Sequence, residues 1–334
     1  MKNEVISMTN RISVVVPAYN IGSFLPRCLD SLLNQTWEDM EIIVVNDGSK
    51  DDTAAVLDRY AAAHSSIKAV HKENGGVTSA RLRGVAEATG DWIGFMDGDD
   101  EVEPRMYGRL LENALSCGAD ISHCGHQVVF PDGRVTCVHN SGALRQQDRL
   151  TGVRDLLDGG EVESSLCTKL FRRELFAGLD AWMDPAIKNN EDYLMNYYLF
   201  ARADRAVFED VCPYHYLLRQ GSASFRVLHE HSLFDPVRVR QRILADCDPE
   251  LHGDARRALL RNLLFAYGQL ALNPGKQYDG YRIRVRALLQ EQKAHFGLLS
   301  ARNRILAHMV CAAPWSFRLA YGLYVKLFRR EEEH

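Results

Sequence analysis

The chain has 334 residues, of which 46% are hydrophobic and 25% are charged, and its formal net charge is −4. This composition is that of an ordinary soluble globular protein with enough apolar residues for a sizeable core. The net charge gives no general reason to expect a nucleic-acid partner, and no run reaches the ~18 to 20 apolar residues of a membrane-spanning helix.

The first hundred residues alternate between short apolar runs and amphipathic segments. The apolar runs are rich in β-branched residues, which is typical of buried strands. Strands are predicted at residues 12–16, 41–45, 67–70 and 92–96. Helices are predicted within residues 23–36, 49–63 and 76–88, the first two with Ser23 and Ser49 as N-caps. Alternation at this interval favours βαβ units and a mostly parallel sheet.

The pattern is less regular between residues 104 and 225. We predict a helix at 104–117, a strand at 120–130, and further helices near 151–158, 169–177 and 191–203. From residue 226 the chain is expected to be mainly helical, with amphipathic segments at 255–272 and 278–292. A domain of residues 1–225 followed by a helical C-terminal region of residues 226–334 is therefore expected.

Polar side chains cluster where three predicted strands end. The sequence PAYN (17–20) follows the first strand, NDGSKDD (46–52) the second, and DGDD (97–100) the fourth. Ligands of parallel α/β sheets bind beyond the carboxyl ends of the strands. The three clusters are therefore expected to meet on one edge of the sheet.

The DGDD cluster places three carboxylates, Asp97, Asp99 and Asp100, next to one another, and they repel unless a cation or hydrogen-bond donors neutralise them. Hard ions such as Mg²⁺ and Mn²⁺ prefer carboxylate oxygen, and Mg²⁺ typically takes one or two carboxylates plus ligand phosphates. The cluster therefore predicts a metal ion that bridges the protein and a diphosphate. The alternative is a solvated acidic turn that caps a helix starting near Pro104.

Four motifs of the first hundred residues, taken in order, resemble glycosyltransferase family 2. They are ISVVVPAYN…FLPRCLDSLLNQT, EIIVVNDGSKDDT, NGGVTSARLRG and ATGDWIGFMDGDD. The later segments LCTKLFRRELF, NNEDYLMN and YHYLLRQGSAS resemble the bacterial polysaccharide-forming branch of that family. The resemblance covers roughly residues 11–225. It implies the nucleotide-diphospho-sugar transferase (GT-A) fold: an α/β, Rossmann-like, mostly parallel sheet flanked by helices, here with a helical C-terminal extension.

The resemblance also implies where a nucleotide-sugar donor binds. Asp47 would accept a hydrogen bond from the nucleobase, Arg81 would lie beside the nucleotide, and Asp97 would lie near the ribose. Asp99 would ligate the divalent metal, Mg²⁺ or Mn²⁺. The nucleotide pocket would be lined by Pro17, Ala18, Tyr19 and Asn20.

For catalysis, the resemblance implies Asp192 of NEDY as the general base, with Glu191 as its stand-in. Acids in the first turn of a helix are also favoured by the helix dipole, an explanation that is compatible with the catalytic role. A loop that contains Arg219, Ser222 and Ser224 would fold over the diphosphate.

Several of these residues also have structural interpretations. Asp47 could begin an Asx-type turn, and Arg81 could lie on a solvated helix face. Lys169 of CTKLF could position a phosphate or the acceptor, or it could be a snorkelling surface lysine. His215 is a candidate metal ligand or a packed histidine. Leu82 stands where the family often has asparagine, a departure on the helix that is expected to meet the nucleotide.

The implied reaction is an inverting transfer of a sugar from a nucleotide-diphosphate-sugar, expected to be a UDP-sugar. The acceptor would be a saccharide or a lipid-linked saccharide in cell-surface polysaccharide synthesis. The metal on Asp99, helped by Arg219, would neutralise the leaving diphosphate, and Asp192 would deprotonate the acceptor hydroxyl. Inversion is implied by the family, and no spacing in this sequence shows it.

The C-terminal segment carries an excess of positive charge. No acidic residue lies between Glu291 and Glu331, whereas seven lysine and arginine residues do. A helix over 315–330 would combine basic residues with Trp315 and other large apolar side chains, which suits an anionic membrane surface. We therefore predict membrane contact through residues 300–330. The alternative is a helix packed on the catalytic domain with its basic face in water.

The compartment is predicted from two further features. The N-terminal segment MKNEVISMTNR lacks the apolar core of a signal peptide. The eight cysteines form no C-x-x-C pair and lie in apolar stretches, as expected of reduced thiols. We therefore expect a cytoplasmic protein, peripheral on the inner face of the cell membrane where the C-terminal helix binds.

Three other functions share part of this pattern. A nicotinamide-dependent oxidoreductase would need G-x-G-x-x-G after the first strand, where this chain has PAYNIG. A nucleotidyltransferase would need a glycine-rich basic phosphate loop near the N-terminus, which this sequence lacks. A module that holds a sugar nucleotide or a partner subunit without turnover is the main alternative.

Overall fold

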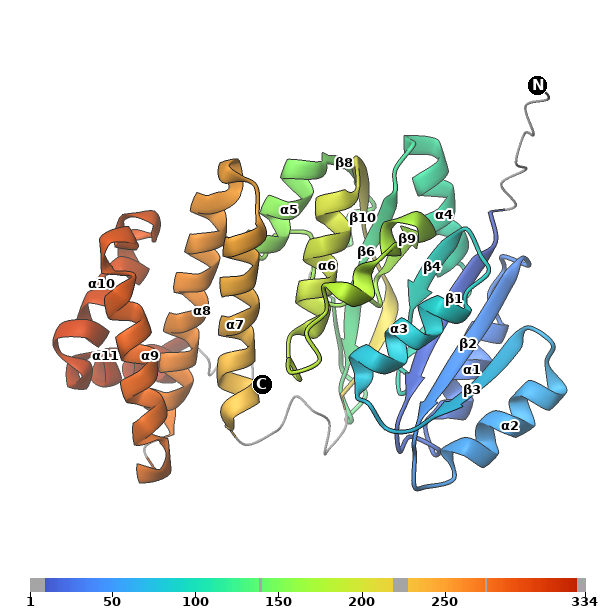
Figure 1. Cartoon of the computed structure of the whole chain (residues 1–334), viewed down its shortest axis with the longest axis horizontal. Helices are drawn as coiled ribbons and strands as arrows, with labels where there is room; N and C mark the ends of the chain where they lie inside the picture. The colour runs from blue at the N-terminus through green and yellow to red at the C-terminus, as the bar shows by residue number, and fades with distance from the viewer. Residues whose placement is uncertain (1–9, 138–139, 219–227, 274, 329–334) are drawn as a thin grey trace. The chain divides into compact units, whose positions relative to one another are not determined.

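The protein is described by a computed structural model that covers residues 10–137, 140–218, 228–273 and 275–328 (Figure 1). The chain divides into two compact units, residues 1–227 and residues 228–334. The described residues of the first unit contain a ten-stranded sheet, and those of the second unit form helices and their connections.

The N-terminal half of the sheet is parallel, in the order β3-β2-β1-β4. The strands are β1 (Ile12–Ala18), β2 (Met40–Asp47), β3 (Ile67–Lys72) and β4 (Trp92–Phe95). The helices between them are α1 (Leu25–Leu33), α2 (Thr53–Ala63) and α3 (Val77–Glu87). The β-branched runs of β1 and β2 are buried on both faces because helices cover both sides, which is why they read as continuous apolar stretches.

The other half of the sheet is mixed. Strand β9 (Lys169–Arg172) pairs antiparallel with both β4 and β6 (Ile121–Val129), and β6 pairs parallel with β10 (Arg205–Leu217). The remaining strands are β5 (Glu101–Val102), β7 (Val135–Cys137) and β8 (Leu144–Asp148). The helices are α4 (Met106–Cys117), α5 (Arg149–Asp158) and α6 (Glu191–Arg202).

Three local predictions were wrong. The segment 169–177 is not a helix but β9 followed by a 3₁₀ turn (Arg173–Phe176), because pairing between two buried strands outweighs local helical periodicity. Ser23 does not cap α1, which begins at Leu25 and has no side-chain cap. Ser49 does not cap α2 either: its hydroxyl accepts a hydrogen bond from the Asn20 N–H at 3.0 Å.

The cysteines also differ from the expectation. Cys137 of β7 and Cys212 of β10 form a disulfide across a sequence separation of 75 residues. The other six cysteines are free thiols, and five of them are buried. The prediction of reduced thiols was therefore wrong for one pair, because β6 pairs with both β7 and β10 and brings two distant cysteines together.

The second unit is a set of packed helices with its own apolar core. The helices are α7 (Glu230–Asp246), α8 (His252–Leu272), α9 (Asp279–Glu291), α10 (Ala301–Ala312) and α11 (Pro314–Phe328). Among the described residues, none of the helices has the length and hydropathy required to cross a bilayer.

Candidate active site

The loops after β1 and β2 are joined by hydrogen bonds at the carboxyl edge of the sheet. The Asn20 side chain accepts from the Lys50 N–H at 2.8 Å, and the Gly22 N–H donates to Asp51 at 3.0 Å. Asn20 adopts a φ of 52°, a left-handed conformation that asparagine tolerates better than most residues. Because β1 pairs with both β2 and β4, the three polar clusters share one edge, as the motifs predicted.

The PAYN segment lies on this edge. Ala18 is buried at the end of β1, and Pro17 is half-buried. Tyr19 is 47% exposed, so its ring is accessible at the edge of the sheet. An exposed aromatic ring beside polar loops can stack on a flat ligand such as a nucleobase.

Asp47 is held by donors from the end of β3 and from the loop before α3. It is only 2% exposed and accepts from the N–H groups of Gly75 (2.9 Å) and Gly76 (2.8 Å) and from Lys72 Nζ (2.5 Å). The turn proposed for it belongs to its neighbour, since Asn46 Oδ1 accepts from the Ser49 N–H at 3.0 Å. Lys72 and Gly75 share Oδ1, whereas Oδ2 accepts from Gly76, so Oδ2 retains capacity for one further donor.

Arg81 connects the acidic turn after β4 with the N-terminus of α6. Its guanidinium is 3.2 Å from Asp97 Oδ1 and 3.0 Å from Glu191 Oε1, and the residue is 5% exposed. Burial alone would lower the pKa of Arg81, but the two carboxylates outweigh it and raise the pKa above its ordinary value. The solvated-face interpretation of Arg81 is therefore wrong. Its Nε is buried and has no hydrogen-bond partner.

Asp100 turns into the protein. It is buried and accepts from the Tyr214 hydroxyl at 2.6 Å and from the Leu217 N–H at 2.9 Å. Burial, reinforced by the charge of Asp97, raises the pKa of Asp100 to about 8. Helix α4 begins at Met106 without a side-chain cap, so DGDD is not a solvated helix-capping turn.

The acidic turn after β4 fits a metal ion that binds together with a phosphate ligand better than a metal ion held by the protein alone. The described residues contain no group of three or more histidine, cysteine, aspartate or glutamate side chains arranged to hold a metal ion. The side chain of Asp97 is 40% exposed, and Asp99 is half-buried. One or two carboxylates are what Mg²⁺ typically takes from a protein when ligand phosphates supply further oxygens. Nε2 of His215 lies 3.6 Å from Oε1 of Glu103 and makes no hydrogen bond to the described residues, so its candidate role as a metal ligand stays a prediction.

Glu191 and Asp192 begin α6, after Asn190 in a left-handed conformation (φ 69°). Glu191 is buried against Arg81, whereas Asp192 is half-buried and accepts from the Tyr193 N–H at 2.7 Å. Burial raises the pKa of both carboxyls, the charge of Asp192 raises that of Glu191 further, and Arg81 opposes both shifts. Asp192 is therefore the carboxylate of the pair that is not bound to Arg81.

Lys169 is fully buried, so the snorkelling interpretation is wrong. Its Nζ donates to the carbonyl of Glu163 at 2.9 Å and to that of Ser165. Asn196 donates to the Ser164 carbonyl at 2.6 Å. Burial lowers the pKa of Lys169 to about 8. Lys169 and Asn196 thus hold the segment 163–165 in place through its carbonyl groups. In the sequence, only the apolar residues next to Lys169 indicate that this lysine is buried.

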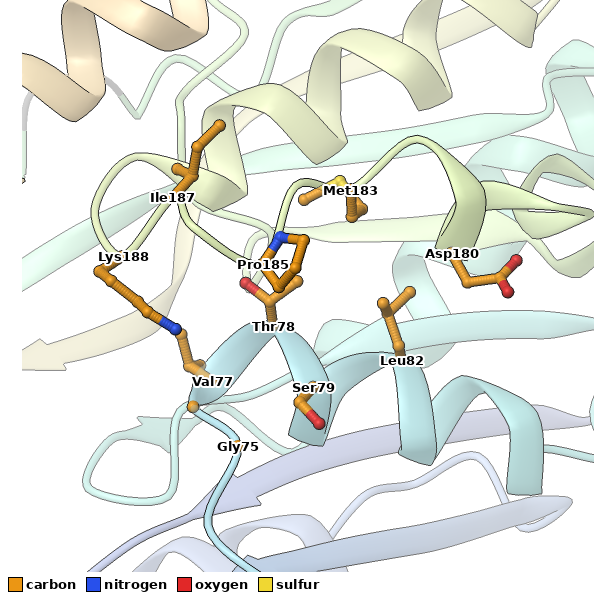
Figure 2. Close-up of a pocket in the computed structure, with 11 residues that line it drawn as sticks. Gly75, Val77, Thr78, Ser79, Leu82, Asp180, Met183, Pro185, Ile187 and Lys188 are labelled. Atoms are coloured by element: carbon orange, nitrogen blue, oxygen red, sulfur yellow. The ribbon is translucent and has the colours of Figure 1, made fainter.

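A cavity of about 360 Å³ lies beside this site, between the start of α3 and the segment 180–188 (Figure 2). Figure 2 shows Thr78 and Leu82 rising from α3 towards Met183 and Pro185. Leu82, the departure from the family pattern, is part of its wall. Sequence reasoning did not find the segment 180–188, which lacks a recognisable motif. The cavity is lined by Gly75, Gly76, Val77, Thr78, Ser79, Leu82, Asp180, Met183, Pro185, Ile187 and Lys188.

Three predicted site residues, Arg219, Ser222 and Ser224, lie outside the described residues. The structure brings the other predicted residues to two places. The first is the carboxyl edge of β1, β2 and β4, with Tyr19 and Asp47. The second is the Arg81 bridge, which joins the acidic turn to α6.

Comparisons with known proteins show which family the chain resembles. The model of the family described as "Glycosyl transferase family 2" matches residues 13–179, half of the chain. The uncharacterized glycosyltransferase EpsJ of Bacillus subtilis (strain 168) is 36% identical over 207 residues, which are 61% of this chain and 60% of EpsJ. The succinoglycan biosynthesis protein ExoO of Rhizobium meliloti (strain 1021) is 30% identical over 221 residues, 65% and 63% of the two chains. The aligned part is thus less than two thirds of either relative.

A solved structure shares the fold over nearly the whole chain. It is residues 1–349 of S. aureus TarS in complex with UDP-GlcNAc, with a TM-score of 0.75 and 21% identity. The superposition covers 95% of this chain and 92% of that one. The predicted α/β fold of the GT-A type, with its helical C-terminal region, is therefore confirmed.

Proposed function

Because this chain belongs to glycosyl transferase family 2, we propose that it is an inverting glycosyltransferase that moves a sugar from a nucleotide-diphosphate-sugar to an acceptor hydroxyl. The observation that carries the proposal is the Arg81 bridge. It joins Asp97, on the edge expected to bind the donor, to Glu191, the neighbour of the expected base. One buried cation thereby ties the donor end of the site to the catalytic end.

The proposed donor is a UDP-sugar. The TarS structure was solved with UDP-GlcNAc, and the shared fold supports the same class of donor here. Tyr19 would stack on the base, while Pro17, Ala18 and Asn20 form the adjoining wall. The imide N–H of uracil would donate to Oδ2 of Asp47, the oxygen with the smaller number of donors.

A divalent metal, Mg²⁺ or Mn²⁺, is part of the proposal. Asp99 would hold it beside the donor diphosphate, with Asp97 near the ribose. When bound, such an ion neutralises the negative charge that develops on the leaving diphosphate. Arg81 keeps its positive charge at this end of the site whether or not the metal is present, since its pKa is raised.

Asp192 is the proposed general base. A new bond forms between the acceptor oxygen and the anomeric carbon, the bond from that carbon to the diphosphate oxygen breaks, and Asp192 takes the acceptor proton. The nucleoside diphosphate leaves with the electron pair of the broken bond. Glu191 is engaged by Arg81, so it would position the guanidinium rather than remove the proton.

We assign the cavity beside α3 to a sugar ring of the donor or the acceptor. Its apolar wall, including Leu82, Met183 and Ile187, can cover a pyranose face, while Thr78 and Ser79 offer hydroxyl groups. The acceptor would be a saccharide or a lipid-linked saccharide in cell-surface polysaccharide synthesis. The similarity to a succinoglycan biosynthesis protein supports this pathway class. Membrane contact through residues 300–330 and a cytoplasmic location belong to the same proposal.

The test is a panel of nucleotide sugars, each with and without Mn²⁺. A true donor should raise the melting temperature and then be turned over. Asp192→Asn should keep donor binding and lose ~10²- to 10⁴-fold in transfer rate. If a bound donor is never turned over, and Asp192→Asn behaves like the parent, the chain is a sugar-nucleotide-binding module instead.

A further inference from the structure

The helical unit exposes an unusual share of large apolar side chains. Of the thirteen such residues among the described parts of the chain, eight lie in residues 228–334, about a third of the chain. Single exposed apolar residues are normal on a protein surface, but a contiguous group marks an interaction site. The group on α11 is contiguous.

Helix α11 is fixed on α8 by its opposite side. Phe317 is buried, stacks on Tyr321 at 5.3 Å and meets Tyr267 edge-to-face at 5.2 Å. Gly268 lets Tyr321 approach, because a Cβ at that glycine would lie 2.6 Å from the tyrosine ring. These contacts determine which face of α11 points towards the core and which points outward.

The outward face carries Trp315, Leu319 and Leu323, which are 70%, 63% and 60% exposed. Their spacing of four residues places them in one row along the helix. We call these three residues the α11 stripe. The alternative in the sequence analysis was a helix with its apolar side packed and its basic side in water. The stripe shows that part of the apolar side is exposed instead.

The C-terminal segment that contains the stripe is basic. Residues 292–330 contain seven lysines and arginines and no aspartate or glutamate. Within the described part, Arg318 lies next to the stripe in the sequence and is exposed, and Arg304 is exposed on α10. A second copy of this chain would set these positive charges against one another, whereas anionic lipid headgroups would neutralise them.

We propose that the α11 stripe inserts into the headgroup region of an anionic bilayer, with Arg318 and Arg304 contacting lipid phosphates. Helices that lie in the membrane interface typically combine tryptophan and leucine with basic residues such as arginine. The proposal identifies the inserting face of the C-terminal segment, and its geometry uses none of the residues of the catalytic site. The catalytic proposal can therefore fail while this one stands.

Co-sedimentation of the full chain with vesicles tests it. The parent should bind vesicles of phosphatidylcholine mixed with phosphatidylglycerol, bind pure phosphatidylcholine much more weakly, and lose binding as salt rises. Replacing Trp315, Leu319 and Leu323 together by serine should reduce binding by about tenfold or more. Ile283→Ser, at a 70% exposed position on α9, is the matched control and should bind within about twofold of the parent.

Fluorescence quenching separates a loss of membrane contact from misfolding of the variant. Brominated lipids should quench the fluorescence of Trp315 in the bound protein, so Trp315→Phe should remove the quenching while Trp182→Phe keeps it. Equal binding by the triple variant and the parent would overturn the proposal, and so would a parent that ignores anionic vesicles. A stripe that instead holds two copies together would appear in light scattering as a dimer that the triple variant converts to monomer.

Discussion

At the scale of single residues, Arg81 is the side chain on which the site depends. Its single positive charge is shared by two carboxylates that come from different parts of the chain, one of them buried. Arg81→Ala should lower the free energy of unfolding by about 3 kcal/mol, because it leaves Glu191 buried without its cation. Urea denaturation measures the loss. Arg83→Ala on the same helix removes an exposed partner of Glu87 and should change stability little.

The same arginine should shift the pH dependence of the proposed transfer reaction. Transfer requires an ionised base, so the rate should fall as pH drops through the apparent pKa of the Glu191–Asp192 pair. Because burial raises these pKa values, the acid limb should lie above the ordinary aspartate value of 3.8. Arg81 opposes the shift, so Arg81→Gln should move the limb to still higher pH, while Arg83→Gln should leave it in place. A limb that moves to lower pH in Arg81→Gln would contradict this assignment.

At the scale of elements, the approach of α3 to β1 depends on Gly84. A Cβ at this position would lie 2.3 Å from Cγ1 of Val15. Gly84→Ala should therefore cost about 1–3 kcal/mol of stability through overpacking, in spite of alanine's better helix propensity. It should also reduce turnover, because Arg81 is carried by the same helix. Val15→Ala should restore both stability and turnover in the double variant, which chemical denaturation and a transfer assay can check.

Some of the helices and strands could be predicted from the sequence, and others could not. Strands β1 to β4 and helices α1 to α3 could be predicted because each carries a local signal, a short apolar run in the strands and an amphipathic pattern in the helices. The segment of β9 could not, because its conformation is decided by pairing with β4 and β6, which lie far away in the sequence. Residues Asp97, Glu191 and Arg81 were found through motifs, yet the bridge between them depends on how α3 and α6 meet and has no local signal. The segment 180–188, which lines the cavity beside α3, carries no local signal either.

At the scale of the whole molecule, the disulfide between Cys137 and Cys212 is a covalent link across 75 residues. The Cys137→Ser/Cys212→Ser variant should lose about 2–4 kcal/mol of stability, because the unfolded chain regains the freedom that the link removes. Denaturation with and without reductant measures the effect, and the parent should lose as much on reduction as the variant does. If reductant does not change the stability of the parent, and both cysteines react with alkylating reagents, the disulfide does not form in solution.

The hydrogen bonds between the loops after β1 and β2 have a consequence for inhibitor affinity. Asn20, Ser49 and Asp51 join these loops through hydrogen bonds within the protein. A nucleoside mimic that occupies this edge would meet loops that these hydrogen bonds already restrain, so we expect little ordering entropy to oppose its binding. Calorimetry on such a compound should therefore show a small entropic penalty, and rigidifying the compound should improve its affinity more than rigidifying the protein.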